Sequence, residues 1–297
     1  DLTMPCYNPL LAYRENGKII FNKPFPFAKG FNLPCGQCIG CKLSYARQWA
    51  IRCLHEAQMH ENNCFITLTF NDEHLVKRNN PFSLDKTEFQ RFMKRLRKHV
   101  KNKIRFFHCG EYGEKNGRPH YHALIFGYDF PDKRKFKSKK GTTLYTSEKL
   151  AELWPYGFST VGDITFHSAS YTARYITKKI TGELADKHYE IINPDTGEVS
   201  KKIPEYCTMS RMPGLGQTWF DKFKSDVYPH DYVVINNFKC KPPRFYDNLL
   251  SEEELKEIKQ KRIDKQDIVY ESLWEYDKLW RKEKHKVKTL ENLIRDL

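Results

Sequence analysis

Apolar side chains recur along this chain at two spacings, and each spacing predicts a different kind of element. Apolar residues recur every three or four positions in "LSYARQWAIRCLHEAQMH" and "EFQRFMKRLRKHV", as on one face of an α-helix. Short β-branched and aromatic runs such as "CFITLTF" are typical of strands. The patterns predict helices over 42–61, 83–100, 146–157 and 168–181, the last capped by Ser168 or Ser170, and strands over 64–70, 104–113, 120–130 and 158–166.

The order of these elements predicts the fold class. Strand, helix, strand, strand, helix, strand, helix is typical of an α+β protein, in which an antiparallel β-sheet has flanking helices. The turn-like "EKNGRP" between the second and third strands indicates a hairpin. We expect a loop-rich, cysteine-bearing N-terminal segment with a helix over 1–60, the α+β core over 61–185, a turn-rich extension packing on the core over 186–250, and a charged helical tail over 251–297.

Composition and charge narrow the class of protein. The 297 residues include 39% hydrophobic ones, and no run approaches the about 18 apolar residues that a membrane helix needs. No secretory signal is visible at the N-terminus, so we expect an intracellular protein without membrane contact. Lys and Arg outnumber Asp and Glu by 51 to 37, for a net charge of +14, and 14% of the residues are aromatic. A polyanion is therefore the expected partner.

One stretch concentrates this positive charge. The segment "DKRKFKSKKG", residues 132–141, is too polar to enter a core, so we expect a solvated loop that can contact the phosphate backbone of DNA. The candidate DNA-binding residues are Lys133, Arg134, Lys135, Lys137, Lys139 and Lys140, together with Lys179. The basic face of the helix over 83–100 is equally consistent with DNA contact and with simple solvation.

Two histidines occupy alternate positions of the strand that contains "PHYHALIFG". Side chains alternate along a strand, so His120 and His122 project from one face and Tyr121 from the other. Glu111 lies across the predicted hairpin turn from His120. Two imidazoles and a carboxylate can bind Mn²⁺, or Mg²⁺ with water, and leave positions open for a substrate oxygen. The alternative is a pair of surface histidines on an edge strand.

A second cluster of chemical groups lies in "YTARYITKK". Tyr171 and Tyr175 are four residues apart on a predicted helix, so both phenols share one face. Arg174 and Lys178 each follow a tyrosine by three residues. The ordinary pKa of a phenol is near 10, so attack on a phosphate needs a nearby cation or metal. Packing in a core or an interface is the alternative role for these tyrosines.

A third cluster consists of cysteines. Cys35, Cys38 and Cys41 stand at two-residue gaps in "CGQCIGC", and Cys6 lies upstream in a similar loop-like setting. Four thiolates at such spacing can bind one structural zinc, which would hold a segment with too few apolar residues to fold by burial. Free thiols and an iron–sulfur cluster are the alternatives. The odd total of nine cysteines, several of them single within predicted elements, indicates reduced thiols rather than a disulfide framework.

In chain order, these motifs resemble those of the HUH rolling-circle replication endonucleases. The shared features are "FITLTF", a glutamate-bearing strand before "PHYH", and the helix with "YTARYITKK". The segments "MPCYNPLLAYR", "PCGQCIGCKLSYARQWAIRC", "ITLTFNDEHL", "GEYGEKNGRPHYHALIFG" and "MSRMPGLG" further resemble replication initiation proteins of small single-stranded DNA phages, the gokushovirus branch of the microviruses. The resemblance covers roughly residues 4–220 and is weak beyond them.

The resemblance implies a nuclease core with an HUH and RRM-like fold over 61–185, and it implies a reaction. A tyrosine would attack a phosphate of single-stranded origin DNA, leaving a 5′-phosphotyrosyl link and a free 3′-hydroxyl, and religation would end rolling-circle replication. A divalent metal would be bound by Glu111, His120 and His122, and catalysis would use Tyr171, Tyr175, Arg174 and Lys178. Because Lys178 follows Tyr175 as in single-tyrosine relatives, Tyr175 is slightly favoured as the first nucleophile. Host helicase and polymerase are implied partners, in the host bacterial cytoplasm.

Two other functions fit part of the sequence. A non-catalytic, zinc-dependent nucleic-acid-binding protein explains the charge and the cysteines, but leaves the ordered glutamate, histidine and tyrosine motifs as coincidence. A metal-dependent nuclease that uses water needs the metal but not the tyrosines. The sequence "GxxxxGK[ST]" is absent, so we do not expect an intrinsic helicase. We expect "MSRMPGLG", residues 209–216, to form a structural turn.

Overall fold

Two units divide the chain. One unit consists of residues 1–48 and 224–297, and the other of residues 49–223. The computed structural model describes residues 6–113, 116–139, 142–178, 188–192, 197, 199–266 and 273–293. No helix in these ranges is both long and apolar enough to cross a bilayer.

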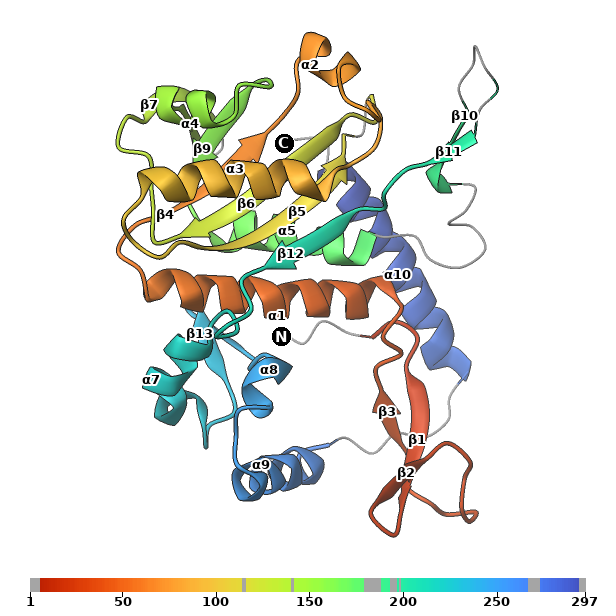
Figure 1. The fold of residues 1–297 in the computed structure, drawn as a ribbon. Coiled ribbons are helices and arrows are strands. Elements are labelled where there is room, and N and C mark those ends of the chain that lie inside the picture. The colour runs from red at the N-terminus through yellow and green to blue at the C-terminus, as the bar shows by residue number, and fades with distance from the viewer. Residues whose placement is uncertain are drawn as a thin grey trace. The chain divides into compact units, whose positions relative to one another are not determined.

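A seven-stranded sheet forms the centre of the unit 49–223 (Figure 1). Its order is β12 (Tyr206–Met209), β5 (Arg105–Tyr112), β6 (Pro119–Phe126), β4 (Asn63–Leu68), β9 (Ser159–Gly162), β8 (Thr142–Thr146) and β7 (Arg134–Lys139). Every pair of neighbouring strands is antiparallel. The predicted α+β class, with an antiparallel sheet and flanking helices, is confirmed.

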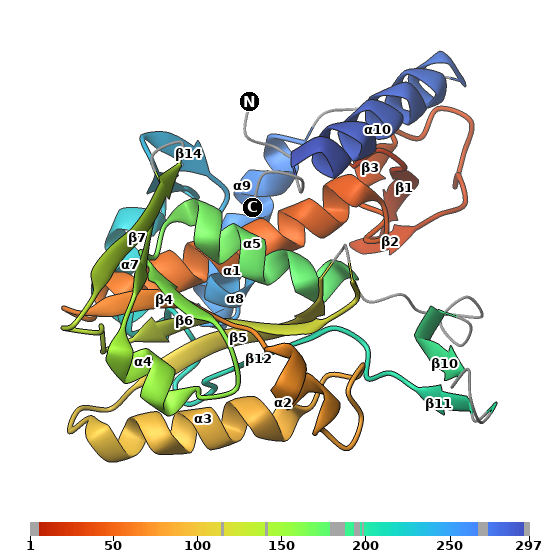
Figure 2. The same cartoon turned by 90° about the horizontal axis from the view of Figure 1, so that it is seen from above.

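One face of this sheet is apolar. Helices α3 (Lys86–His99) and α4 (Glu148–Leu153) cover it, and Figure 2 shows α3 across the sheet from α5. Strand β4 contributes Ile66 and Leu68 to this core, and α3 contributes Phe92, all of them fully buried. Each strand residue alternates with one that faces the other way, so the apolar face fixes the register of the opposite, polar face.

Helix α5 (Phe166–Lys178) covers the opposite face. It begins two residues before the predicted Ser168. Thr165 Oγ1 accepts the Ser168 N–H at 3.1 Å, and Ser168 Oγ accepts the Thr165 N–H at 2.9 Å. The predicted caps, Ser168 and Ser170, are therefore wrong, because this reciprocal pair caps the helix at Thr165. The C-terminal half of α1 (Ile39–Gln58) packs on the same face, where Trp49 stacks on Phe107 at 5.3 Å.

The lysine-rich segment is not the solvated loop that we expected. Residues 134–139 form β7, which pairs with β8 at the edge of the sheet. Segments without apolar alternation can still form an edge strand, because only one side of such a strand pairs and its side chains stay in water. Lysines on an edge also discourage pairing with another chain.

The turn at residues 210–216 is held from inside its unit. The Arg105 guanidinium donates to the backbone carbonyls of Met212 and Pro213, at 3.2 and 2.5 Å. The Gly216 N–H donates to Glu56 Oε2 at 2.8 Å, and Arg105 pairs with the same carboxylate. Buried groups thus satisfy the backbone of "MSRMPGLG", in agreement with the predicted structural turn.

The unit of residues 1–48 and 224–297 has its own small sheets. Strand β1 (Leu10–Glu15) pairs with β2 (Lys18–Ile20) and with β3 (Phe31–Leu33), and β13 (Val233–Ile235) pairs with β14 (Phe238–Cys240). Helices α8 (Arg244–Asp247), α9 (Glu252–Asp264) and α10 (Leu273–Leu293) follow, and Ser251 caps α9 with a capping box. The helical C-terminal tail is confirmed.

The remaining elements are short or lie at the limits of the units. They are α2 (Asp72–Val76), which falls on a segment that we expected to be a turn, β10 (Glu190–Ile192), β11 (Val199–Lys201) and α7 (Gln217–Val227).

Candidate active site

The predicted metal ligands project from the α5 face of the sheet. Strands β5 and β6 form the predicted hairpin, whose register places Glu111 opposite His120 and Cys109 opposite His122. Glu111, His120 and His122 therefore share one face, as strand alternation predicts. Glu111 and His122 are 6% and 7% exposed, so their chemistry takes place away from bulk water.

Two hydrogen bonds fix the His122 ring. Its Nε2 lies 2.6 Å from Glu111 Oε1, and its Nδ1 lies 3.0 Å from Thr67 Oγ1. The ring also stacks parallel to Phe65, with the centroids 5.7 Å apart. Partners on both nitrogens orient the ring as an outer shell orients a metal-ligating histidine. Sequence analysis missed Thr67, although a polar residue inside the apolar strand "FITLTF" is a signal for it.

His120 lies in a niche next to Gly113. A Cβ atom at residue 113 would come within 2.6 Å of His120 Cε1, so the glycine makes room for the imidazole. Burial lowers the pKa of His120, against the charge of Glu111, which raises it. A neutral imidazole is the form that ligates a metal. This use of Gly113 was not predicted, since "GEYGEKNG" reads as a turn.

The three predicted ligands do not all converge. Among the described residues, only the four predicted cysteines bring three or more His, Cys, Asp or Glu ligand atoms close enough for one ion. Glu111 and His122 are in contact, whereas His120 stands opposite Glu111 without completing such a group. The Glu111–His122 hydrogen bond joins the two atoms that an ion would otherwise separate.

Both predicted tyrosines reach this cluster from α5. The Tyr171 hydroxyl donates to Glu111 Oε1 at 3.0 Å, and its ring packs edge-on to His122 at 5.2 Å. The Tyr175 ring stacks on His122 at 6.4 Å and meets Tyr171 edge-on at 5.3 Å. Tyr171 is half-buried and Tyr175 is only 3% exposed.

The electrostatics of the site oppose phenolate formation. Burial, followed by the charge of Glu111, raises the pKa of Tyr171 and of Tyr175 well above 10. Burial would also raise the pKa of Glu111, but hydrogen bonds from His122, Tyr175 and Tyr171 outweigh it and lower that pKa. The site therefore holds a carboxylate beside two protonated phenols, and a cation is needed to favour attack by either one.

The predicted cations are only partly in view. The Arg174 Cζ lies 5.7 Å from the centre of the Tyr171 ring. Lys178 is the last residue of α5. The side chains of Lys178 and Lys139, and the whole of Lys140 and Lys179, lie outside the described residues.

The basic residues of the sheet edge differ in their partners. Lys133 pairs with Asp129 at 2.6 Å, and Arg134 pairs with Glu148 at 3.2 Å. Lys135 and Lys137 are exposed on β7.

Tyr121 faces away from the site, as predicted. Its side chain is fully buried in the apolar core. Its oxygen lies 2.5 Å from Glu88 Oε2 and accepts the Asp85 N–H at 2.9 Å. Glu88 in turn pairs with Arg78 at 2.7 Å. Tyr121 therefore anchors strand β6 to the start of α3.

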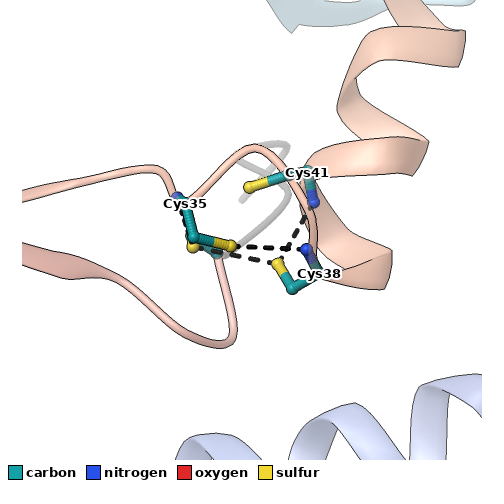
Figure 3. Close-up of side chains that lie close together, drawn as sticks. Cys35, Cys38 and Cys41 are labelled. Carbon is teal, nitrogen blue, oxygen red and sulfur yellow. Dashed lines mark hydrogen bonds between the residues drawn. The ribbon is translucent and has the colours of Figure 1, made fainter. Parts of the chain in front are cut away.

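The four predicted cysteines come together in the other unit. The sulfur atoms of Cys6, Cys35, Cys38 and Cys41 all lie within 4.8 Å of one another, a geometry that can hold a metal such as zinc (Figure 3). Backbone N–H groups point at these sulfurs: Cys35 donates to Cys6 at 3.2 Å, and Cys38 donates to Cys35 at 3.3 Å.

The protonation of Cys38 favours a metal site. Burial alone would raise its pKa, but hydrogen bonds from the N–H groups of Cys41 and Tyr7 lower it to about 7. Thiolates are the metal-binding form of cysteine. Donation from the backbone is the support expected for sulfurs that carry charge.

Comparisons with known proteins agree with this picture. A family model for the replication-associated protein ORF2 matches residues 63–180. Replication-associated protein VP4 of Bdellovibrio phage phiMH2K is 34% identical over 259 residues, which cover 82% of this chain and 76% of the relative. Replication-associated protein ORF2 of Spiroplasma virus 4 is 34% identical over 75% of this chain and 68% of its own.

Replication-associated protein ORF4 of Chlamydia phage 1 is 30% identical over 74% of this chain and 54% of its own. No solved structure gives a significant match. The extent of the identity to the first two relatives goes well beyond the matched core, and the chain therefore belongs to the family of phage replication-associated proteins that the ORF2 model describes.

Proposed function

We propose that this replication-associated protein nicks single-stranded origin DNA by tyrosine transesterification and later rejoins the strand. One observation carries the proposal. Glu111 Oε1 lies 2.6 Å from His122 Nε2 and 3.0 Å from the Tyr171 hydroxyl, so a candidate nucleophile and two candidate metal ligands meet at one atom. Packing alone does not require a buried carboxylate between a histidine and a tyrosine.

The reaction uses groups that the site holds. The Tyr171 phenol oxygen attacks the scissile phosphorus, and its proton passes to Glu111 Oε1. The bond from phosphorus to the 3′-oxygen breaks, and that oxygen leaves as a 3′-hydroxyl after taking up a proton. The phosphotyrosyl ester replaces one phosphodiester. Attack by a 3′-hydroxyl on this ester reverses the step and rejoins the strand.

Glu111, His120 and His122 would hold a Mn²⁺ or Mg²⁺ ion. A carboxylate with two imidazoles suits a first-row divalent metal, and the niche at Gly113 leaves space for the His120 ring. The ion would polarise the phosphate and supply the positive charge that two buried phenols beside a carboxylate require. Thr67, through His122 Nδ1, would keep that ring in its ligating orientation.

Different positions of the two tyrosines support different tasks. Tyr171 is the more accessible and donates to Glu111, and Arg174 lies over its ring, which supports Tyr171 as the first nucleophile. Tyr175 lies deeper, stacked on His122, and would act in the second cleavage. This order reverses the preference for Tyr175 that the position of Lys178 suggested, because accessibility to DNA is the stronger constraint.

Phosphate contacts would come from the edge of the sheet. The exposed Lys135 and Lys137 of β7 can neutralise phosphates of a bound strand. A host helicase and polymerase would unwind the duplex and extend the 3′-hydroxyl.

The experiment uses Mn²⁺ and single-stranded oligonucleotides tiled across the DNA that encodes the protein, each labelled at its 3′ end. Because the tyrosine retains the 5′-phosphate, the labelled fragment should stay attached to the protein in denaturing gels. The variant Tyr171→Phe should lose most of the adduct, and Tyr171→Phe/Tyr175→Phe should lose all of it. Tyr128→Phe, outside the site, is the matched control.

Other outcomes would overturn the proposal. A protein that binds without catalysis gives neither cleavage nor adduct, and a nuclease that uses water cleaves without an adduct. An adduct that persists in the double variant excludes both tyrosines.

We also propose that the four-cysteine cluster binds a structural zinc. Four sulfurs make a closed site that leaves no position for a substrate. The ligands lie in a loop-rich segment, to which Cys6 adds a long-range link of about 30 residues along the chain. The zinc would stabilise the fold of this segment and would take no part in the reaction.

A further inference from the structure

The loop between β2 and β3 exposes phenylalanine side chains. Phe27 is 91% exposed, Phe21 is 60% exposed and Phe25 is 58% exposed. We call residues 21–30 the phenylalanine loop (Figure 1). Single exposed apolar residues are common, but three large aromatic side chains in seven residues of a water-facing loop indicate a binding function.

The exposure is built into the loop. The Ala28 N–H donates to the Phe25 carbonyl at 3.0 Å, which closes a turn with Phe27 at its tip. Pro24 and Pro26 restrict the backbone on both sides of Phe25. At the base of the loop the same residue type behaves differently, because Phe31 on β3 is buried beneath the Arg14 guanidinium at 4.5 Å. The sheet is thus an ordered base that holds the loop phenylalanines in water.

The charge around these rings indicates the kind of partner. Lys18, Lys23 and Lys29 are exposed, and no Asp or Glu occurs between residues 16 and 34. None of the described residues forms an ion pair with these three lysines. The partner should therefore be negatively charged and should also offer flat apolar faces.

We propose that the phenylalanine loop binds single-stranded DNA, with its rings stacked on unpaired bases and its lysines on the flanking phosphates. Unpaired bases present π-faces beside a polyanionic backbone, which matches the interleaved rings and cations. In a duplex the same faces are hidden by base pairing. The proposal goes beyond the proposed nicking and stands without it, because no residue of the candidate active site takes part.

Binding is measured with the full chain and a fluorescein-labelled oligothymidylate of about 20 nucleotides, by anisotropy. The triple variant Phe21→Ala/Phe25→Ala/Phe27→Ala should bind at least about fivefold more weakly, because each stacked base contributes measurably to affinity. Phe238→Ala is the matched control, since Phe238 is 61% exposed in the β13–β14 hairpin of the same unit. Its affinity should stay within about twofold of the parent.

Salt separates the rings from the lysines. The variant Lys18→Ala/Lys23→Ala/Lys29→Ala should reduce the slope of log K against log salt by about 2, since each phosphate contact on a single strand contributes about 0.7. The phenylalanine variant should keep the parent slope and lose affinity equally at every salt concentration. An unchanged slope in the lysine variant would contradict the role assigned to the lysines.

A photochemical test locates the stacked ring. An oligothymidylate with 5-iododeoxyuridine should crosslink to Phe25 or Phe27, as mapped by mass spectrometry. The single variant Phe27→Ala removes a side chain that is almost wholly exposed, so it tests the proposal without affecting the fold. Unchanged affinity in both phenylalanine variants, without crosslinks in the loop, would overturn the proposal.

Vesicles distinguish another polyanionic partner. If the triple phenylalanine variant binds oligothymidylate normally but loses binding to phosphatidylglycerol vesicles, the loop contacts lipid and the proposal is wrong. Loss of binding to the oligonucleotide, with the parent showing no vesicle binding, supports it. The thermal midpoint of each variant confirms that the fold is retained.

Discussion

The cysteine cluster and the Glu111–His122–Tyr171 cluster are built from opposite kinds of local structure. The four cysteines come from loops and the start of a helix, and their sulfurs gather within 4.8 Å of one another. Glu111 and His122 stand on paired strands whose positions are set by a sheet, and an alcohol donor, Tyr171, bonds to the same carboxylate. One cluster is closed by its own ligands, and the other includes a group that can react.

The difference indicates what each cluster requires. A closed set of thiolates needs a metal to neutralise it and stabilises the segment that carries it. A site on a rigid sheet keeps its shape without a metal, because strand pairing and the apolar face beneath it hold the backbone in place. Removing a ligand should therefore affect the fold in the first cluster and the reaction in the second.

The largest expected effect concerns the reaction. His122→Ala removes a proposed metal ligand and the partner of Glu111, so adduct formation under single-turnover conditions should fall by about a thousandfold or more, about 4 kcal/mol. The denaturation midpoint should change little. His230→Ala, exposed and outside the site, should keep full activity. Near-normal adduct formation by His122→Ala would exclude the metal site.

The second effect concerns the fold of the cysteine segment. Cys38→Ser should lose about one equivalent of zinc, measured by elemental analysis, and proteolysis within residues 6–41 should be about tenfold faster, which corresponds to about 1.4 kcal/mol of local stability. Cys240→Ala, outside the cluster, should keep its zinc. A strong chelator that leaves the protease resistance of the parent unchanged would exclude structural zinc.

A third effect tests the support beneath the histidines. Tyr121→Phe leaves the buried Asp85 N–H and Glu88 carboxylate without the hydroxyl, so the free energy of unfolding should fall by about 1–3 kcal/mol in urea titrations. Adduct formation should decrease less than in His122→Ala. Tyr45→Phe, which is exposed, serves as the control. Abolished adduct in a fully folded Tyr121→Phe would make Tyr121 part of the reaction.

The smallest effect is a loss of stability at acidic pH. Burial lowers the pKa of His55, stacked on Trp219 at 3.5 Å, to about 3. The unfolded chain binds this proton below about pH 6.5 and the folded chain does not, so stability falls by about 1.4 kcal/mol per pH unit from about 6.5 towards 3. His122→Ala should keep this slope in thermal scans. A slope that disappears with His122 would assign it to the site instead.

Much of the candidate site could be predicted from the sequence because its geometry follows from alternation. The hairpin between β5 and β6 fixes which side chains share a face, and the apolar residues around His122 and Tyr121 fix which face is which. The cysteine spacing likewise predicted the cluster around Cys38. These relations are local in the chain, so residue order determines them.

Other parts could not be predicted because they depend on distant pairing or on a single contact. Strand β12 pairs with β5 about 100 residues earlier, and no periodicity in "EYCTMS" indicates that partner. Strand β7 carries lysines in place of an apolar pattern. The contact between Glu111 and His122, and the niche at Gly113, depend on side-chain positions that only the folded sheet sets.

The anchor of Tyr121 on the start of α3 has a consequence for heredity. Substitutions at Arg78 or Glu88 would loosen strand β6 from the side opposite the histidines, without changing any group that touches DNA. Such alleles would replicate normally in the cold and fail in the heat, because a weakened anchor is lost before the sheet unfolds. Temperature-sensitive mutations in this gene are therefore expected to map to the sheet face that has no part in the chemistry.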